Sequence, residues 1–550
     1  MILPLIPPAP IDRHALVTRH NVVLTAYDGE RPLQVGNGEF AFGMDVTGLQ
    51  TFAPFNTMSQ WGWLRSPLPK GERIENYRMP IYPTHGREVP YPLPDPNHPA
   101  LSDWLRKNPH RLNLGRVGLV LTKADGTAAS PKDLRNIRQS LDMWRGVVTS
   151  QFEIESQPVK VVTVCHPKLD AIAARVESPL IGLGRLSAFV DAPGDDDREF
   201  AHFVGNWDGS SGLERLNSGR NRADFVRKLP GDGAYTHVSL TWTGDAAIRS
   251  PEPSLPLKLI RAEYGAEGSW ADVTSVAERL IRENRLSLRV GNDLFGDPAE
   301  KRVKTLRVTY EEGGRRSTVE AKENEQLTIG GANRRFTLVP NPKGGALAFV
   351  CAFAPKLLSK RLPSPDATLI ASEKAWPAYW QKGGAIDLSE SKDPRWKELE
   401  RRIVLSQYLM KVNESGSEPP QESGLVNNGW YGRFHLEMVW WHLTHWALWN
   451  RWDDIERTRR FYLRQMPKAK ELAKAQGYQG ARWPKCIGPD GQEWPFWNHA
   501  YLMWQQPNPI FFAELDYRAH PTAETLKKWQ PIVDATADFL ASWAFYDAPT

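Results

Sequence analysis

The amino-acid sequence predicts two kinds of domain, a large antiparallel β-sandwich followed by an array of paired α-helices. From about residue 18 to 355, short runs of alternating apolar and polar residues are broken by Gly, Pro, Asn and Asp, as in antiparallel strands. From residue 394 onward, the apolar residues recur instead with the helical period of about 3.6. A chain of 550 residues also exceeds what one hydrophobic core usually serves, so more than one domain is expected.

The strand pattern is clearest around a predicted hairpin. Residues 146–155 and 159–164 alternate in polarity, and Ser156, Gln157 and Pro158 between them predict the turn. Only short helices are expected in this part, such as one over residues 270–284. Many short strands predict one large sandwich domain at residues 1–355. Further strands are predicted at residues 306–310, 317–320, 326–329 and 335–339.

A linker at residues 356–393, with a helix over 365–376, precedes the helical domain expected at residues 394–550. Residues 434–450 are apolar on almost every side, which predicts a helix buried all round. Residues 455–476 are amphipathic, with a kink expected at Pro467. Buried helices that alternate with amphipathic ones indicate an inner and an outer ring. The other helices are predicted at residues 396–411, 509–519 and 523–544.

Composition argues against several classes of function. The net charge of +5 is spread along the chain without a basic tract, so no nucleic-acid partner is expected. No run of 18 apolar residues predicts a membrane span, and the proline-rich N-terminus lacks the apolar stretch of a secretory signal. The three cysteines, Cys165, Cys351 and Cys486, are too few and too far apart to predict a disulfide framework or a zinc site.

Three segments resemble those of six-hairpin glycosidases. Residues 31–43 include Gly36, Asn37 and Gly38, similar to the "G-N-G" turn that opens the sandwich of that group; such a tight turn needs positive φ. Residues 421–442 resemble the segment where glycoside hydrolase family 65, the maltose- and trehalose-phosphorylase family, carries its "W-D-T-E" motif. They are more similar still to uncharacterised bacterial proteins with "W-Y-G-K-F-H-x-E-M". Residues 480–484 are similar to the "G-A-x-Y-P-W" loop of the same group.

The resemblance implies an N-terminal antiparallel β-supersandwich followed by an (α/α)6 six-hairpin barrel. A full ring needs about twelve helices and about five are predicted here, so the barrel is expected to be incomplete and the chain truncated. It also implies an inverting glycoside hydrolase that acts on an oligo- or polysaccharide without a cofactor, in a secreted or periplasmic protein. The general acid of these families comes from the second half of the barrel and is therefore expected beyond residue 550.

Glu437 is the candidate catalytic carboxylate. Inversion requires an acid on one face of the glycosidic bond and a base or phosphate on the other. Glu437 is predicted in the first turn of an almost uncharged helix, where it either lines a pocket or stabilises the helix start through the dipole. His435, in the place of the family's Asp, is expected on one helix face with His442 and His445. Hydrogen-bonded histidines are favoured over metal ligands, which would need an i,i+4 pair and a carboxylate.

A sugar-binding surface is predicted around these residues. Ten of the 22 Trp residues lie between Trp430 and Trp504, and the flat face of Trp suits the C–H faces of sugar rings as well as protein cores. Amide and guanidinium groups suit vicinal hydroxyls. For each single residue, packing remains an alternative. The candidates are Trp430, Tyr431, His435, Trp440, Arg482, Trp483, Gln505 and Gln506, with Gln421, Glu422, Asn427, Asn428 and Trp504 beside them.

Three alternatives to hydrolysis stay open. Phosphorolysis would need a phosphate pocket, expected in the missing half of the barrel. A carbohydrate-binding protein without catalysis would keep only the aromatic surface. A polysaccharide lyase would need a base beside groups that neutralise charge, for which Tyr431, His435 and Arg433 are the candidates.

Overall fold

The computed structural model describes residues 10–201, 203–207, 212–229, 235–251, 255–282, 284–330 and 335–546. It divides into two compact units. The first combines residues 1–247 with residues 339–550, and the second comprises residues 248–338. The prediction of one strand-rich domain over residues 1–355 does not anticipate this division, because the alternating pattern continues unbroken through both units.

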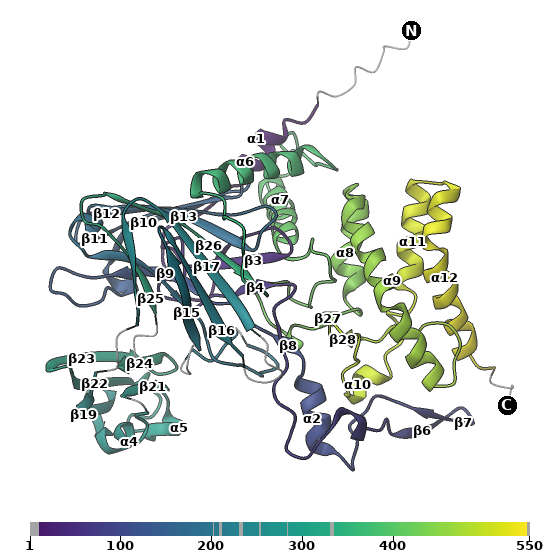
Figure 1. The fold of residues 1–550 in the computed structure, drawn as a ribbon, viewed down its shortest axis with the longest axis horizontal. Coiled ribbons are helices and arrows are strands. Elements are labelled where there is room, and N and C mark those ends of the chain that lie inside the picture. Colours follow the sequence, from purple (N-terminus) through teal and green to yellow (C-terminus); the bar gives the residue numbers. More distant parts are fainter. Residues whose placement is uncertain are drawn as a thin grey trace, which may run out of the picture. The chain divides into compact units, whose positions relative to one another are not determined.

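The first unit is built on a nine-stranded antiparallel sheet (Figure 1). Its strands are β1 (Val22–Leu24), β10 (Leu134–Asp142), β11 (Val147–Ile154), β12 (Gln157–Cys165), β13 (Ala171–Glu177), β15 (Leu213–Gly219), β16 (Arg222–Lys228), β17 (Tyr235–Thr243) and β26 (Ala346–Ala354). Their order is β1-β10-β11-β12-β13-β26-β17-β16-β15. The predicted hairpin is β11–β12, and its turn lies at Glu155 and Ser156, where φ is 49° and 62°. Two consecutive positive φ values match the right-handed twist of the flanking strands.

Smaller elements surround this sheet. The strands are β2 (Leu33–Gly36), β3 (Phe40–Met44), β4 (Thr57–Ser59), β5 (Trp63–Leu64), β6 (Ile81–Thr84), β7 (Arg87–Pro90), β8 (His110–Arg111), β9 (Arg116–Leu121) and β14 (Leu186–Asp191). The helices are α1 (Arg13–Thr18), α2 (Pro99–Lys107) and α3 (Pro179–Gly182), with 3-10 turns η1 (Ile74–Asn76) and η2 (Pro131–Asp133). β2, β3 and β4 form one sheet, while β5 pairs with β8 and β6 with β7.

The predicted turn at Gly36–Gly38 joins β2 to β3. Its side-chain amide secures it, because Asn37 Oδ1 accepts the backbone N–H groups of Glu39 and Phe40, each at 2.9 Å. Only Gly38 has positive φ, at 93°. A Cβ there would overlap Ser415 in the loop that follows the first long helix of the C-terminal part. The turn therefore docks the strands onto the helical part.

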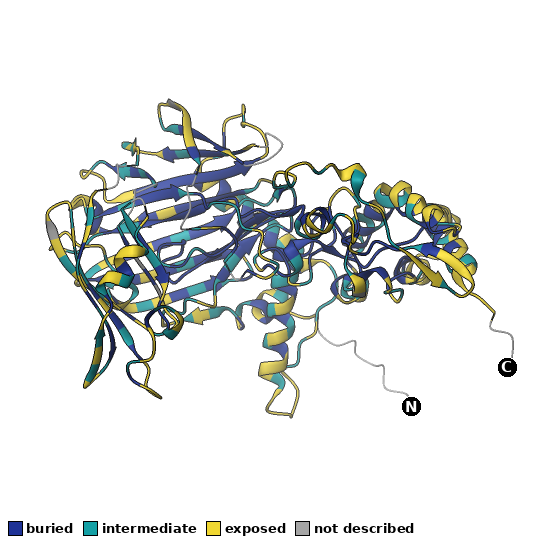
Figure 2. Ribbon diagram, turned by 90° about the horizontal axis from the view of Figure 1, so that it is seen from below, coloured by how far each residue is buried: buried dark blue, intermediate teal, exposed yellow. Residues whose placement is uncertain are grey.

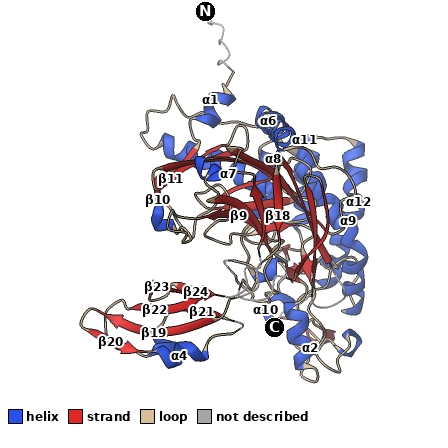
Figure 3. Cartoon of the chain, turned by 60° about the vertical axis from the view of Figure 1, so that its left-hand side comes forward, coloured by secondary structure: helices blue, strands red, loops and turns tan. Residues whose placement is uncertain are grey.

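The second unit contains β19 (Leu257–Ala266), β20 (Ser269–Asp272), β21 (Arg285–Arg289), β22 (Thr305–Glu312), β23 (Arg315–Lys322), β24 (Gln326–Gly330), α4 (Thr274–Arg279) and α5 (Asn292–Phe295). A four-stranded sheet has the order β20-β19-β22-β23, and α4 packs against β19 (Figure 3). The helix predicted at residues 270–284 is wrong in its first part, because residues 269–272 pair with β19 instead. β18 (Ala246–Arg249) and β25 (Phe336–Pro340) carry the chain into and out of this unit.

The C-terminal part is helical, as predicted. Its elements are α6 (Pro365–Gln381), α7 (Trp396–Asn413), η3 (Trp430–Gly432), β27 (Phe434–His435), α8 (Val439–Leu448), α9 (Trp452–Ala475), β28 (Cys486–Ile487), α10 (Trp497–Ala500), α11 (Asn508–Ala519) and α12 (Ala523–Trp543). α8 packs against α9 and α11, and α12 packs against the same two helices. Among the described residues, no helix combines the length and the apolar character needed to cross a membrane.

Two predictions about the helix over residues 434–450 are wrong, namely that it starts at residue 434 and that it is buried all round. Residues 434–435 form β27, and α8 begins only at Val439. Trp441 and Leu448 are 52% and 74% exposed, although Leu443 and Trp446 are buried in the core of the helical part. Figure 2 shows exposed turns on the helices and mostly buried residues along many of the strands. One face of α8 therefore remains open to solvent.

Helix α6 covers the large sheet, packing against β11, β12, β13 and β26. Trp376 and Trp380 on this helix are buried, and Trp380 Nε1 donates to Met143 O at 2.7 Å. The turn between β10 and β11 passes close to Trp376 at Gly146, which has φ of 65°. A Cβ at Gly146 would overlap the Trp376 indole. Because Gly146 has no side chain, Trp376 and with it α6 can pack closely against the sheet.

We expect Gly146→Ala to destabilise the protein more than Gly184→Ala does. Both glycines have nearly the same positive φ, 65° and 66°, so both substitutions carry the left-handed strain of about 1–2 kcal/mol. Only Gly146 has a neighbour in the way, since a Cβ at Gly184 meets nothing within 4 Å. The clash should cost about 1–3 kcal/mol more, measured as a larger fall in the urea midpoint. Equal losses for the two variants would contradict the proposed contact.

Candidate functional site

The segment that resembles the family 65 motif begins with an unusual backbone. Trp430, Tyr431 and Gly432 follow one another with φ of 56°, 59° and 69°. Left-handed conformations of bulky residues are costly and tend to occur at functional sites. Arg111 secures this turn, because its Nε donates to Gly432 O at 3.1 Å. The Tyr431 N–H donates to Glu199 O at 3.0 Å. The surrounding structure therefore imposes the conformation.

A two-stranded sheet brings the two predicted motifs together. β27 pairs with β28, with Phe434 opposite Ile487 and His435 opposite Cys486. The backbone N–H of Glu437 then donates to Lys485 O at 3.2 Å. Residues 430–438 and 480–487 therefore form one site, although the whole of α9 separates them in sequence.

The centre of this site is an ion pair between Glu437 and Lys485. Lys485 Nζ lies 2.9 Å from Glu437 Oε2, and His435 Nε2 lies 3.6 Å from the same oxygen. Burial alone would raise the pKa of Glu437, but His435 and Lys485 outweigh it and lower the pKa to about 2. Burial would lower the pKa of His435, but Cys486 and Glu437 outweigh it and raise that pKa to about 9. Glu437 is therefore a carboxylate at neutral pH.

Two predictions about this helix start are wrong. Glu437 precedes α8 rather than lying in its first turn, since Met438 is the N-cap residue. His435 lies in β27, so it does not share a helix face with His442 and His445. Burial is the main cause that lowers the pKa of both His442 and His445 to about 4, which leaves them neutral. Within the described ranges, no three His, Cys, Asp or Glu side chains are grouped to hold a metal ion.

An aromatic wall flanks the ion pair. Lys485 Nζ lies 5.4 Å from the centre of the Trp430 ring, within the range of a cation–π interaction. The Trp430 ring centre is 6.0 Å from that of His435, 5.6 Å from Trp494 and 5.7 Å from His499. Burial is the main reason why the pKa of His499 falls to about 3. These rings therefore lie beside the ion pair, with His435 cationic and His499 neutral at neutral pH.

Several buried polar atoms of this cluster have no hydrogen-bond partner among the described residues. They are His435 Nδ1, both ring nitrogens of His499, and Trp494 Nε1. Buried polar groups are normally paired, and each exception needs an explanation such as an absent water or ligand. The cluster therefore holds unpaired buried donors and acceptors beneath the partly exposed Glu437 and Trp430.

Three other predicted site residues have internal contacts in the structure. Trp483 is 1% exposed, and its Nε1 donates to Thr536 Oγ1 at 2.9 Å. The amide of Gln505 donates to Trp483 O at 3.0 Å. The amide of Gln506 donates to Ala481 O at 2.6 Å, and its oxygen accepts the Trp483 N–H at 2.8 Å. These contacts fix the backbone at residues 481–483 and thereby help to position Lys485, which follows directly.

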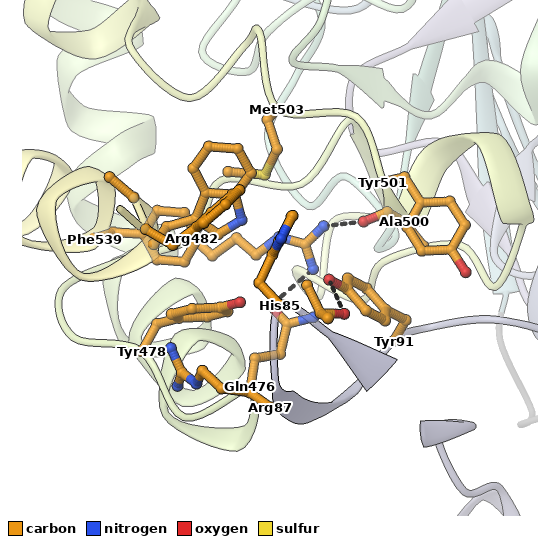
Figure 4. Close-up of a pocket in the computed structure, with 14 residues that line it drawn as sticks. His85, Arg87, Tyr91, Gln476, Tyr478, Arg482, Ala500, Tyr501, Met503 and Phe539 are labelled. Carbon is orange, nitrogen blue, oxygen red and sulfur yellow. Dashed lines mark hydrogen bonds between the residues drawn. The ribbon is translucent and has the colours of Figure 1, made fainter. Parts of the chain in front are cut away.

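Arg482 lines a cavity of about 210 Å³ together with Tyr91, Tyr478 and Tyr501 (Figure 4). Its Nη1 donates to Gln476 Oε1 at 2.9 Å, and its Nη2 donates to Ala500 O. No described contact joins Arg482 to Glu437.

The remaining predicted residues lie on both sides of the site. Trp440 is half-buried and packs against Phe511, with ring centres 5.6 Å apart. Trp504 is 60% exposed, and its ring centre is 6.1 Å from that of Trp441. These rings form an accessible aromatic surface on α8 and the loop before α11.

The predicted residues in the loop before β27 have different surroundings. The Gln421 amide donates to Gly424 O and Asn427 O, so it shapes the loop. Asn427 is exposed, whereas Asn428 is buried and its Oδ1 has no partner among the described residues. The half-buried Glu422 helps to raise the pKa of His435.

The two lyase candidates beside His435 do not suit a base mechanism. Burial raises the pKa of Tyr431 to about 12, and its ring packs against Trp494. The fully buried Arg433 donates to the backbone oxygens of Pro109, at 3.1 Å, and of Leu105, at 2.8 Å. Both side chains therefore support the turn rather than face Glu437.

Sequence reasoning missed Lys485, His499 and Trp494. Lys485 directly follows the motif at residues 480–484, which was the only available signal for it. The pairing of β27 with β28 places Lys485 beside Glu437, and two-residue strands leave no period in the sequence.

Comparison with known proteins supports the resemblance. No family model matches the chain. A solved structure titled "Putative kojibiose phosphorylase from human microbiome" has a TM-score of 0.55 at 10% identity and covers 96% of this chain. The chain resembles six-hairpin glycosidases. The predicted distant similarity to the family 65 phosphorylases is thus confirmed at the level of the fold.

Two further matches are weaker. A bacterial glucoamylase complexed with acarbose has a TM-score of 0.42 at 9% identity, with 95% of this chain and 62% of that one covered. A protein of Formosa agariphila named "Putative beta-glucuronidase" is 26% identical over 206 residues, which is 34% of this chain. The chain spans 60% of the kojibiose phosphorylase structure and 17% of the Formosa protein.

We expect Glu437→Gln to destabilise the protein in a pH-dependent way. The carboxyl pKa is about 2 in the folded state and 4.5 ordinarily, so its stabilisation is fully present above pH 4.5 and is lost as pH falls towards 2. The variant should lose about 2–3 kcal/mol at pH 7, with a difference that shrinks below pH 4.5 in urea melts. The exposed Glu524→Gln is the control. A difference independent of pH would contradict the ion pair.

Proposed function

We propose that this chain is carbohydrate-active and that the cluster around Glu437 is its saccharide-binding site. The observation that carries the proposal is the set of unpartnered polar atoms on His435, His499 and Trp494 beside the Glu437–Lys485 pair. Sugar hydroxyls both donate and accept hydrogen bonds, and the C–H faces of a sugar ring suit an aromatic face. Trp430 offers such a face next to the ion pair. The glycosidase-like fold is consistent with this assignment.

The reaction we propose for the whole protein is inverting hydrolysis of a glycosidic bond without a cofactor. Inversion needs a carboxylic acid that stays protonated and a carboxylate that acts as base. Glu437, with a pKa of about 2, suits the role of an acceptor for sugar hydroxyls or for water. It does not suit the role of proton donor, which has to come from another residue.

We further propose that the helices from residue 394 onward belong to a six-hairpin barrel that follows a β-supersandwich and a linker at residues 356–393. The arrangement of α8, α9, α11 and α12 supports this, because α8 contacts α11 while α9 contacts α12. The long loops before α8 and α11 both reach the Glu437 cluster. The accessible rings of Trp441 and Trp504 suit the inner side of such a ring.

Glu437→Gln should weaken sugar binding by about 10–100-fold, because a hydrogen bond to a charged group contributes about 1.5–3 kcal/mol. Calorimetry with neutral and uronic oligosaccharides would measure this, with Glu524→Gln as the control. Wild-type protein that binds no saccharide, or a variant that binds as tightly as wild type, would contradict the proposed site.

Turnover of aryl glycosides by the same protein would separate the possible reactions. Hydrolysis that is indifferent to added phosphate supports the proposed hydrolase, whereas acceleration by phosphate indicates a phosphorylase. Ultraviolet absorbance from an unsaturated uronate product would indicate a lyase. Binding without any turnover would indicate a carbohydrate-binding protein.

A further inference from the structure

A second cavity, of about 540 Å³, lies between the strands of the first unit and helix α9. Glu39 lines it from the turn between β2 and β3, and Glu418 from the loop after α7. Gln60 and Trp61 line it from the segment between β4 and β5, and Trp63 from β5 itself. Arg464 lines it from α9. Phe434 of β27 also lines it, so the cavity adjoins the Glu437 cluster, but Glu437, Lys485 and Trp430 do not line it.

Two tryptophans in fixed positions form one side of this cavity. Trp61 Nε1 donates to Asp170 Oδ2 at 2.6 Å, and Trp63 Nε1 donates to Gln60 O at 2.8 Å. The Arg111 guanidinium carbon lies 4.0 Å from the Trp63 ring centre. Both rings are half-buried. Because the indole N–H groups are already bonded to the protein, what remains for a ligand is apolar ring surface held in place beforehand.

The cavity also has one donor and one acceptor without a partner among the described residues. Gln60 is only 5% exposed, and its Nε2 makes no hydrogen bond, while its Oε1 accepts from Arg111 at 3.2 Å. Glu418 Oε1 accepts from Arg464 at 2.6 Å, but Glu418 Oε2 is buried and unbonded. Both atoms are buried, so a hydroxyl group in the cavity can accept from the first and donate to the second once these side chains turn toward it.

The charges of the lining are nearly balanced. Glu39 accepts from Ser417 Oγ at 2.9 Å, Glu418 pairs with Arg464, and Asp490 pairs with Arg65. Lys468 pairs with Glu471 at 2.8 Å. Glu39 keeps its negative charge beside a neutral hydroxyl, while the other charges named here are paired. An anionic ligand would therefore be repelled, whereas an uncharged ligand rich in hydroxyls avoids that cost.

We propose that this cavity is a second saccharide site, which binds an uncharged sugar ring against Trp61 and Trp63 with hydroxyls bonded to Gln60 and Glu418. The proposal goes beyond the function assigned to Glu437 and shares with it only the class of ligand. Such a site would retain a polysaccharide while another part of it occupies the Glu437 cluster.

The test uses calorimetry on the full chain with uncharged oligosaccharides of glucose, xylose and galactose, and with oligouronates. In a Glu437→Gln background, the remaining binding should belong to the second cavity. Glu418→Gln, which keeps the shape of the side chain, should weaken that binding at least tenfold. Ser417→Arg, on the exposed rim, should also weaken that binding at least tenfold, because the long arginine side chain would occupy the cavity. Glu398→Gln is the matched control, because it also pairs with arginines, Arg401 and Arg402, but lines neither site.

Hydrogen exchange with saturating sugar should show protection over residues 59–64 and 414–420. Circular dichroism and thermal melts would establish that each variant is folded. The proposal fails if Glu437→Gln alone removes all binding, or if Glu418→Gln and Ser417→Arg bind as the control does. It also fails if oligouronates bind this cavity better than uncharged sugars. If Glu418→Gln loses binding while Glu437→Gln binds as tightly as wild type, the Glu437 site is overturned and the second cavity remains supported.

Discussion

The buried guanidinium of Arg111 connects the strand-rich part of the first unit to both candidate sites. It is 2% exposed and donates to the backbone oxygens of Gly432, Ser59 and Gln60. Burial lowers its pKa to about 9, so it remains a cation at neutral pH. A fixed planar group with five donors can hold several carbonyls at once, which lysine cannot do. The turn before Glu437 and the platform at Trp63 therefore have a common support.

The left-handed turn at Trp430 and Tyr431 depends on this support. An unrestrained chain would relax this strained turn. Here the Arg111 side chain packs into the space left by the missing side chain of Gly432 and so holds the turn in place. The result is that the Trp430 ring lies beside Lys485 instead of pointing away from the ion pair. Conformational strain here maintains the geometry of a polar cluster in which several buried atoms have no hydrogen-bond partner among the described residues.

Much of the fold could be predicted because it depends on local patterns. The 3.6 period located α7, α9, α11 and α12 to within a few residues, and alternation located β11, β12 and β22. The start of α8 was not predictable, because Phe434 and His435 pair with a strand about 50 residues away. Glu437 was found through its motif, but the partners that set its charge, Lys485 and His435, depend on that same long-range pairing. The burial of Gln505 and Gln506 likewise follows from tertiary contacts that composition does not reveal.

The unit at residues 248–338 enters between β18 and β25, which are neighbours in one sheet. All nine strands of the large sheet lie outside it, and its own core closes around Leu259, Tyr264 and Leu306. Insertions whose ends leave and return at adjacent strands can be exchanged or deleted without changing the register of the host sheet. This segment is thus a module that evolution could vary independently of the proposed saccharide sites elsewhere in the chain.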